Sequence, residues 1–150
     1  MRIVIQRSLG SRLSIDGELF SEAGAGLMIL VGVETGDTEA DAEWLADKAL
    51  GMRIFNDDAG VMNRSVLDVG GDVMAVSQFT LTASTRKGRR PSYIRAAGHD
   101  VAVGLYEYFC SLLDRALSKP CARGKFGADM KIAFTNDGPV TIIVDSRLKE

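Results

Sequence analysis

The pattern of hydrophobic and polar positions predicts a chain built mainly of short strands. Apolar and polar residues alternate moderately over residues 2–8, as in a strand with one buried face. Residues 27–33 instead form a continuous apolar run, which is typical of a strand buried on both faces. By these criteria strands are expected at residues 2–8, 11–15, 18–23, 27–33, 72–78, 130–135 and 140–145. Gly10 is expected to separate the first two strands. Asp16 and Gly17 are expected to form a hairpin turn, because both residues tolerate a positive φ.

Two segments have the periodicity of amphipathic helices. In the first, Thr38 is the expected N-cap with Asp41 as its capping-box partner, and Gly51 suits the left-handed position after the last turn. Its apolar face comprises Ala42, Leu45, Ala46, Ala49 and Leu50. The second helix is expected to run from Asp100, as its cap, to about Ser118. Its predicted apolar face comprises Val101, Leu105, Tyr108, Phe109, Leu112 and Ala116.

The order of these elements favours one fold class. Strands follow one another in hairpin runs instead of alternating strictly with helices, which favours an α+β fold over a doubly wound one. The chain has 150 residues, the common size of one domain. We therefore expect a single α+β domain over residues 1–150, with a mainly antiparallel, barrel-like sheet packed with two helices.

Composition excludes several classes of protein. Hydrophobic residues make up 46% and charged residues 25%, as in an ordinary globular protein and unlike a disordered one. No apolar run approaches the roughly 20 residues of a membrane helix, and the apolar core at the N-terminus is too short for a signal peptide. Cys110 and Cys121 are too few for a secreted disulfide scaffold. We expect two free thiols in a cytoplasmic protein with no membrane partner.

Few residues are suited to holding a cofactor. His99 is the one histidine and cannot build a His-rich zinc site, and the two cysteines lack finger spacing. There is no phosphate-binding loop of the P-loop type, and residues 24–26 lack the third glycine of a dinucleotide fingerprint. The acidic turn at residues 56–60 lacks the terminal Glu of an EF-hand. We expect neither a metal nor an organic cofactor.

Charge is unevenly distributed along the chain. The net charge of −2 argues against nucleic acid as a partner. Residues 73–99, however, hold five Lys and Arg and no acid, which leaves a net −7 on the rest. A polar loop is expected at residues 82–92, and its cations suit phosphate groups better than a merely solubilising role. The candidate RNA-binding residues are Arg86, Lys87, Arg89, Arg90 and Tyr93, the last as a stacking platform for a base.

Residues 77–81, with the sequence SQFTL, are the first candidate for chemistry. They place polar side chains at the end of an apolar strand, as functional edges do, although a plain strand end with solvated hydroxyls has the same pattern. A nucleophilic Ser77 or Thr80 would need a base. His99, beside Asp100 at a helix start, is expected to be a surface residue. This inventory favours backbone or substrate-assisted catalysis over a Ser-His-Asp triad.

Residues 136–141, with the sequence NDGPVT, are the second candidate. A plain hairpin turn explains the Gly-Pro pair, yet a proline at the start of an apolar strand requires an edge or a bulge. Proline statistics favour a trans bond, although the cis form costs only about 0.5–1 kcal/mol more. A cis Gly138-Pro139 bond would point two carbonyls the same way, which makes a rigid recognition surface of backbone.

Together these segments resemble the D-aminoacyl-tRNA deacylase family. The resemblance is carried by residues 77–81 and 136–141, and it covers nearly the whole chain. Supporting segments are residues 5–7 (IQR), 52–55 (MRIF), 90–93 (RPSY) and 126–130 (FGADM). Each main motif is short, but both of them in this order and at this spacing are specific.

The resemblance implies a homodimeric enzyme that hydrolyses the ester between a D-amino acid and the 3′-terminal adenosine of tRNA, and that also acts on mischarged glycyl-tRNA. Such an enzyme serves chiral proofreading in translation and uses no metal or organic cofactor. In the family a cis Gly-Pro, here Gly138 and Pro139, enters the partner subunit's site and rejects L-amino acids. The implied pocket residues are Ser77, Gln78, Phe79, Thr80 and Met130.

An aminoacyl ester is already activated, so its hydrolysis needs a placed water and donors for the oxyanion more than a strong nucleophile. Main-chain N–H groups around Phe79 would supply the donors, and the neighbouring ribose hydroxyl would help to activate water. An acyl-enzyme on Thr80 is the alternative mechanism. The alternative functions are a non-catalytic RNA- or phosphate-binding module and a hydrolase of another ester or a peptide.

Overall fold

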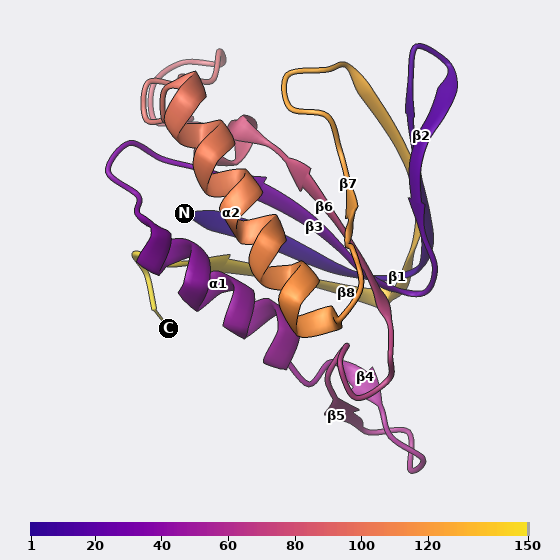
Figure 1. Ribbon diagram of the computed structural model, residues 1–150. Coiled ribbons are helices and arrows are strands. Elements are labelled where there is room, and N and C mark those ends of the chain that lie inside the picture. The colour runs from indigo at the N-terminus through magenta and orange to yellow at the C-terminus, as the bar shows by residue number, and fades with distance from the viewer. Residues whose placement is uncertain (150) are drawn as a thin grey trace.

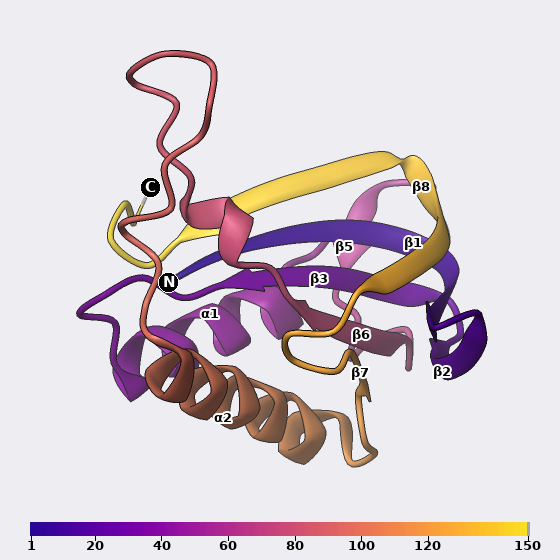
Figure 2. The same ribbon diagram turned by 90° about the horizontal axis from the view of Figure 1, so that it is seen from above.

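A strongly curved mixed sheet, nearly closed into a barrel, forms the body of the molecule (Figure 1). The computed structural model describes residues 1–149. Six strands build this sheet: β1 (Arg2–Ile15), β2 (Glu18–Ala23), β3 (Gly26–Gly32), β6 (Asp72–Ser77), β7 (Ala122–Arg123) and β8 (Met130–Asp145). The short pair β4 (Phe55–Asn56) and β5 (Met62–Arg64) stands apart from it. Helices α1 (Glu39–Gly51) and α2 (His99–Leu117) cover one face of the sheet (Figure 2).

Strand β1 is the element to which most of the sheet is attached. One edge pairs antiparallel with β3 and then with β2, while the other edge pairs antiparallel with β8. The predicted break at Gly10 is wrong, because β1 continues through it as one strand of 14 residues. Gly10 has a φ of +147°, and the Ser8 hydroxyl accepts a hydrogen bond from its N–H at 3.0 Å. The backbone therefore bends there, and its register with β8 shifts, without the strand ending.

Strand β8 is likewise one strand where two were expected. The predicted turn at residues 136–139 is wrong, because the chain passes through this segment and both halves pair with β1. Gln6 lies opposite Thr141 and Ser8 lies opposite Asn136, with a register shift between them. The Gly-Pro pair is thus an irregularity inside a long ladder. The sheet as a whole is mixed, because the pairings of β1 are antiparallel, whereas β3 pairs parallel with β6 and β6 pairs parallel with β7.

Helix α1 confirms its local signals. Thr38 is the N-cap, and its N–H donates to the Asp41 carboxylate at 2.8 Å, which completes the predicted capping box. The predicted apolar face is buried throughout. Gly51, by contrast, is the last helical residue and is not left-handed, because the chain leaves through Met52 at a φ of −66°. The Met52 N–H donates to the carbonyl of Lys48 at 3.0 Å, so the helix end has a partner without a glycine cap.

Helix α2 starts two residues earlier than predicted and presents a rotated face. Gly98 is its N-cap, so Asp100 lies within the first turn, and Ser118 ends the helix with a φ of 55°. Val101 was expected in the core but is 53% exposed. The buried face comprises Ala102, Leu105, Tyr106, Phe109, Cys110 and Leu113. Two apolar stripes lie side by side on this helix, and the stripe that contains Tyr106 packs against the sheet. The Tyr106 hydroxyl donates to the carbonyl of Ala75 at 2.8 Å.

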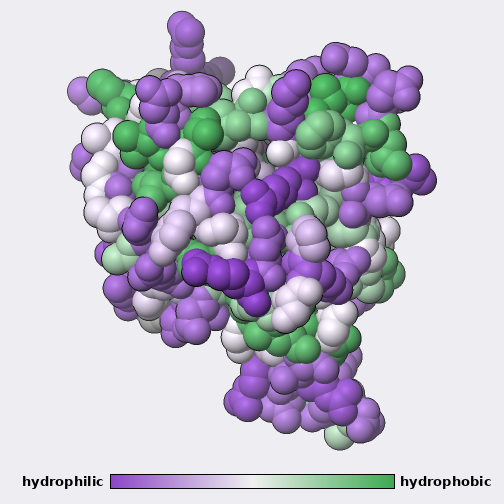
Figure 3. All heavy atoms as spheres, viewed as in Figure 1, coloured by the Kyte–Doolittle hydropathy of each residue, from purple (hydrophilic) through white to green (hydrophobic). Residues whose placement is uncertain are grey.

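The core has two parts because β3 and β6 are buried on both faces. Along β3, Ile29 and Val31 belong to the large cluster under the helices, whereas Met28 belongs to a second cluster with Leu13 and Met74. Alternation of side chains across a strand places these clusters on opposite faces, as the apolar run of residues 27–33 predicted. The outward surfaces of the helices are mainly hydrophilic (Figure 3). Within residues 1–149, no helix is long and apolar enough to cross a membrane.

We predict that Gly26→Ala destabilises the protein by about 3 kcal/mol, in the range of overpacked interiors. A Cβ atom at Gly26 would lie 1.9 Å from the carbonyl oxygen of Asp72, its parallel partner in β6. Gly104→Ala is the matched control, because Gly104 lies in α2 with nothing within 4 Å of an added Cβ, and it should gain about 0.5–1 kcal/mol. Urea unfolding measures both, and an unchanged midpoint for Gly26→Ala would contradict the prediction.

Candidate active site

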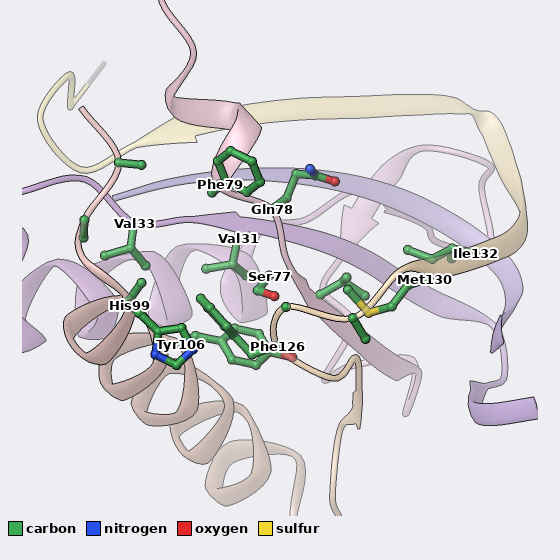
Figure 4. Close-up of a pocket in the computed structure, with 16 residues that line it drawn as sticks. Val31, Val33, Ser77, Gln78, Phe79, His99, Tyr106, Phe126, Met130 and Ile132 are labelled. Carbon is green, nitrogen blue, oxygen red and sulfur yellow. The ribbon is translucent and has the colours of Figure 1, made fainter. Parts of the chain in front are cut away.

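A pocket of about 470 Å³ opens beyond the ends of β3 and β6, between the sheet and the start of α2 (Figure 4). Its few polar groups come from Ser77, Gln78 and His99. Its apolar walls include Val31, Phe79, Tyr106, Phe126, Met130 and Ile132. A concave, mostly apolar cavity with a few convergent polar groups is typical of a small-ligand site.

The end of β6 positions the first motif. The β3–β6 ladder ends at Val31 and Ser77, and the Gln78 N–H donates to the Val31 carbonyl at 2.7 Å. The chain then turns into a short 3-10 helix, η1 (Phe79–Thr82), which the strand pattern did not predict. The first residues of a helix have N–H groups without an intrahelical acceptor. The N–H group of Phe79, which lines the pocket next to Ser77, is therefore available as a donor.

The four predicted catalytic residues do not all lie in the pocket. Ser77, Gln78 and Phe79 line it, and Phe79 is 56% exposed at its edge. Thr80 is not among the lining residues, and its hydroxyl accepts a hydrogen bond from the Gln78 side-chain amide at 2.6 Å. Met130, the predicted pocket residue from β8, does line the wall.

The side of the pocket formed by α2 includes the uncharged side chain of Tyr106. The Tyr106 hydroxyl donates to the carbonyl of Ala75, two residues before Ser77, and the side chain is buried. Burial raises the pKa of Tyr106 far above its usual value, and Cys110 acts in the same direction. The phenol therefore stays protonated. Among residues 1–149, no cluster of three or more His, Cys, Asp or Glu side chains could hold a metal ion.

His99 is a surface residue, as its sequence position predicted, and it also lies at the mouth of this pocket. Its side chain is 74% exposed, and its ring packs edge-on against Phe126 with centroids 5.3 Å apart. Phe126 comes from the loop between β7 and β8, distant in the sequence. No local signal at residues 98–100 could have revealed this contact.

Gly138 and Pro139 are joined by a cis peptide bond and are exposed, and neither residue lines the pocket of its own subunit. Arg7, largely buried, lies under this segment and pairs through Nε with the Asp137 carboxylate at 2.9 Å. Its Nη1 donates to the carbonyl of Ile54 at 2.7 Å.

The other side of this segment is held by Asn136. Its side-chain oxygen accepts from the Val140 N–H at 3.2 Å, and its amide donates to the Thr141 hydroxyl at 2.9 Å. The Gly-Pro segment is thus braced from both sides and displayed at the surface.

The predicted basic loop projects away from the sheet and the two helices (Figure 2). Its base is closed by paired backbone hydrogen bonds between Ser84 and Ser92, at 2.8 and 2.9 Å. The four cations of its tip are exposed: Arg86, Lys87, Arg89 and Arg90. Tyr93 follows the loop and packs edge-on against Phe79, with centroids 5.0 Å apart. Tyr93 therefore connects the basic loop to the edge of the pocket.

Comparisons with known proteins point in one direction. A family described as D-Tyr-tRNA(Tyr) deacylase matches residues 4–145. The D-aminoacyl-tRNA deacylases of Phocaeicola vulgatus and Parabacteroides distasonis are each 55% identical over 150 residues, covering 100% of both chains. The D-aminoacyl-tRNA deacylase of Dechloromonas aromatica is 48% identical over the same length and coverage.

Two solved structures share the fold. The c-Myc DNA unwinding element binding protein matches with a TM-score of 0.92 at 35% identity, over 97% of this chain and 98% of that chain. A probable eukaryotic D-amino acid tRNA deacylase matches with a TM-score of 0.81 over 95% and 97%. At 18% identity this second likeness concerns the fold alone.

We predict that Arg7→Gln lowers stability by about 1–3 kcal/mol, because it removes the hydrogen-bond donor to the Ile54 carbonyl and the cation that pairs with the Asp137 carboxylate. Arg12→Gln is a matched control on the same strand, since Arg12 pairs with Glu22 at 3.8 Å and both side chains are more than 60% exposed. It should change stability by less than about 0.5 kcal/mol. Thermal unfolding of both variants checks this, and equal shifts would contradict it.

Proposed function

The chain belongs to the D-Tyr-tRNA(Tyr) deacylase family, as its motifs indicated, and on this premise we propose that it hydrolyses the ester between a D-amino acid and the 3′-terminal adenosine of tRNA. The observation that carries the proposal is the position of residues 77–79, the motif of the family resemblance, in a pocket of about 470 Å³. That volume lies in the range of ligand sites. Proofreading during translation would place the enzyme in the cytoplasm.

The chemistry proposed is direct attack by water. The ester carbonyl would lie beside Ser77, with the N–H group of Phe79 as a donor to the developing oxyanion. The part of the pocket lined by Ser77, Gln78 and Phe79 offers a hydroxyl, an amide and backbone groups, and within residues 1–149 the lining contains no carboxylate. We therefore assign the activation of water to the ribose hydroxyl next to the ester. The position of Thr80 outside the lining, with its hydroxyl bonded by Gln78, supports water over an acyl-enzyme on Thr80.

Discrimination against L-amino acids is assigned to Gly138 and Pro139 acting in a homodimer. The segment is exposed, braced by Arg7 and Asn136, and absent from the lining of its own pocket, which suits a role in the partner's pocket. Rigid backbone carbonyls there would leave room for hydrogen or a D side chain but not for an L side chain. Glycine would also be accepted, because a site that excludes a group cannot exclude its absence.

The basic loop is assigned to the acceptor end of the tRNA. Four exposed cations lie on a projecting loop, and Tyr93, which follows the loop, packs against Phe79 at the pocket edge. Phosphate contacts of this kind position the substrate and carry no sequence information themselves. The rest of the chain is acidic, with a net charge of −7 outside residues 73–99.

We predict that the purified protein deacylates D-Tyr-tRNA and leaves L-Tyr-tRNA intact. The measurement is the loss of radiolabelled amino acid from matched D- and L-aminoacylated tRNA. Gly-tRNA should also be hydrolysed, because it presents no side chain to exclude. Equal rates on the D and L esters would remove the chiral role of Gly138 and Pro139. Binding of both tRNAs with hydrolysis of neither would favour a non-catalytic RNA-binding module.

We predict that a D-aminoacyl-tRNA ending in 2′-deoxyadenosine reacts about 10²-fold more slowly, the usual scale of lost acid–base assistance. The same kcat on both substrates would exclude help from the ribose hydroxyl.

Thr80→Val, which keeps the shape of the side chain, should retain most of the turnover on the natural substrate. A folded Thr80→Val protein without activity would support the acyl-enzyme instead.

A further inference from the structure

The pocket has two chemically different sides. Figure 4 shows Gln78 and Phe79 on one side and His99, Tyr106 and Phe126 on the other, with Ser77 between them. The second side is aromatic. The rings of His99 and Phe126 lie 5.3 Å apart at 81°, and those of Tyr106 and Phe126 lie 6.3 Å apart.

The three aromatic residues differ in what they contribute to the fold. Tyr106 is a member of the buried core, and Phe126 packs against that core from the loop. His99 does neither, because its side chain is 74% exposed, and among residues 1–149 its Nδ1 has one partner, the neighbouring carboxylate of Asp100 at 3.3 Å. An imidazole ring in this position adds little buried area to the core, and most of its surface stays open to a ligand at the mouth of the pocket.

The substrate of the proposed function has a part that suits this side. When the ester lies beside Ser77, the aromatic side of the pocket, opposite Gln78 and Phe79, is open to the nucleoside that carries the ester. Its adenine is flat and largely apolar on its faces, and bases bind proteins by packing on aromatic side chains. A cavity of about 470 Å³ has room for more than the aminoacyl group.

We propose that His99 is a substrate-binding residue, and that its ring, supported by Phe126, packs against the adenine of the terminal nucleoside. This inference rests on the proposed function, since it assigns the part of the substrate that the aromatic side of the pocket receives. The contact is made to the base and not to the ester. It therefore strengthens substrate binding, and the chemical step does not depend on it.

The first test uses the fact that the chain has one histidine. The ring resonances of His99 can be assigned in an NMR spectrum without ambiguity. Adenosine, titrated into the protein, should shift these resonances through the ring current of the base, whereas D-ribose, the matched probe without a base, should not. Resonances that stay in place at saturating adenosine, or that respond equally to ribose, overturn the proposal.

The second test separates binding from chemistry. His99→Ala should raise the KM for D-Tyr-tRNA about 5- to 100-fold with kcat unchanged, as expected for loss of one aromatic contact to a base. His99→Phe should restore KM, because it keeps a ring. Val101→Ala, an exposed residue of the same helix turn outside the pocket lining, is the control and should change neither constant.

These outcomes distinguish the two proposals. An unchanged KM in His99→Ala overturns the role of His99 while hydrolysis of D-Tyr-tRNA by the wild type leaves the proposed function standing. A fall in kcat at constant KM also overturns it, because His99 would then serve the chemical step. A wild-type protein that does not hydrolyse D-Tyr-tRNA removes the proposed function and, with it, the assignment of the base.

Discussion

The pairing of both edges of β1 is the constraint on which the rest of the structure depends. One edge binds β3 and β2, and the other binds β8 along almost its whole length. Because each half of β8 has a partner on the same strand, residues 136–141 are held inside a continuous ladder. Backbone hydrogen bonds on either side of the segment and the Arg7 side chain beneath it fix where Gly138 and Pro139 are displayed. A free hairpin turn would not be held in this way.

The burial of the central strands determines where the pocket lies. Strands β3 and β6 are buried on both faces, so polar side chains appear only where they end. Ser77 and Gln78 are the first polar residues beyond the apolar part of β6, and they emerge next to the start of α2. Tyr106 ties α2 to the Ala75 carbonyl on that strand. The packing of α2 on the sheet therefore forms the pocket, and core residues such as Tyr106 build the side of the pocket that α2 contributes.

Features that depend on near neighbours in the sequence could be predicted, and features that depend on distant partners could not. The capping box of Thr38 and Asp41 and the buried run at residues 27–33 are local, and both were recognised. Gly10 resembles a break, but β1 and β8 continue past their irregular positions because long-range pairing outweighs local turn signals. In the site, the motif at residues 77–79 pointed to the pocket, whereas the place of His99 depends on Phe126, which only the fold brings near.

The projecting loop that carries Arg86, Lys87, Arg89 and Arg90 gives the molecule an electric asymmetry that its net charge of −2 conceals. A polyanion approaching the acidic body is repelled, and one approaching the loop is attracted. At physiological salt this discrimination acts within about 8 Å of the surface. Encounters with a polyanion are thus sorted by orientation before any specific contact forms, and those that begin at the loop begin close to Tyr93 and Phe79 at the pocket edge.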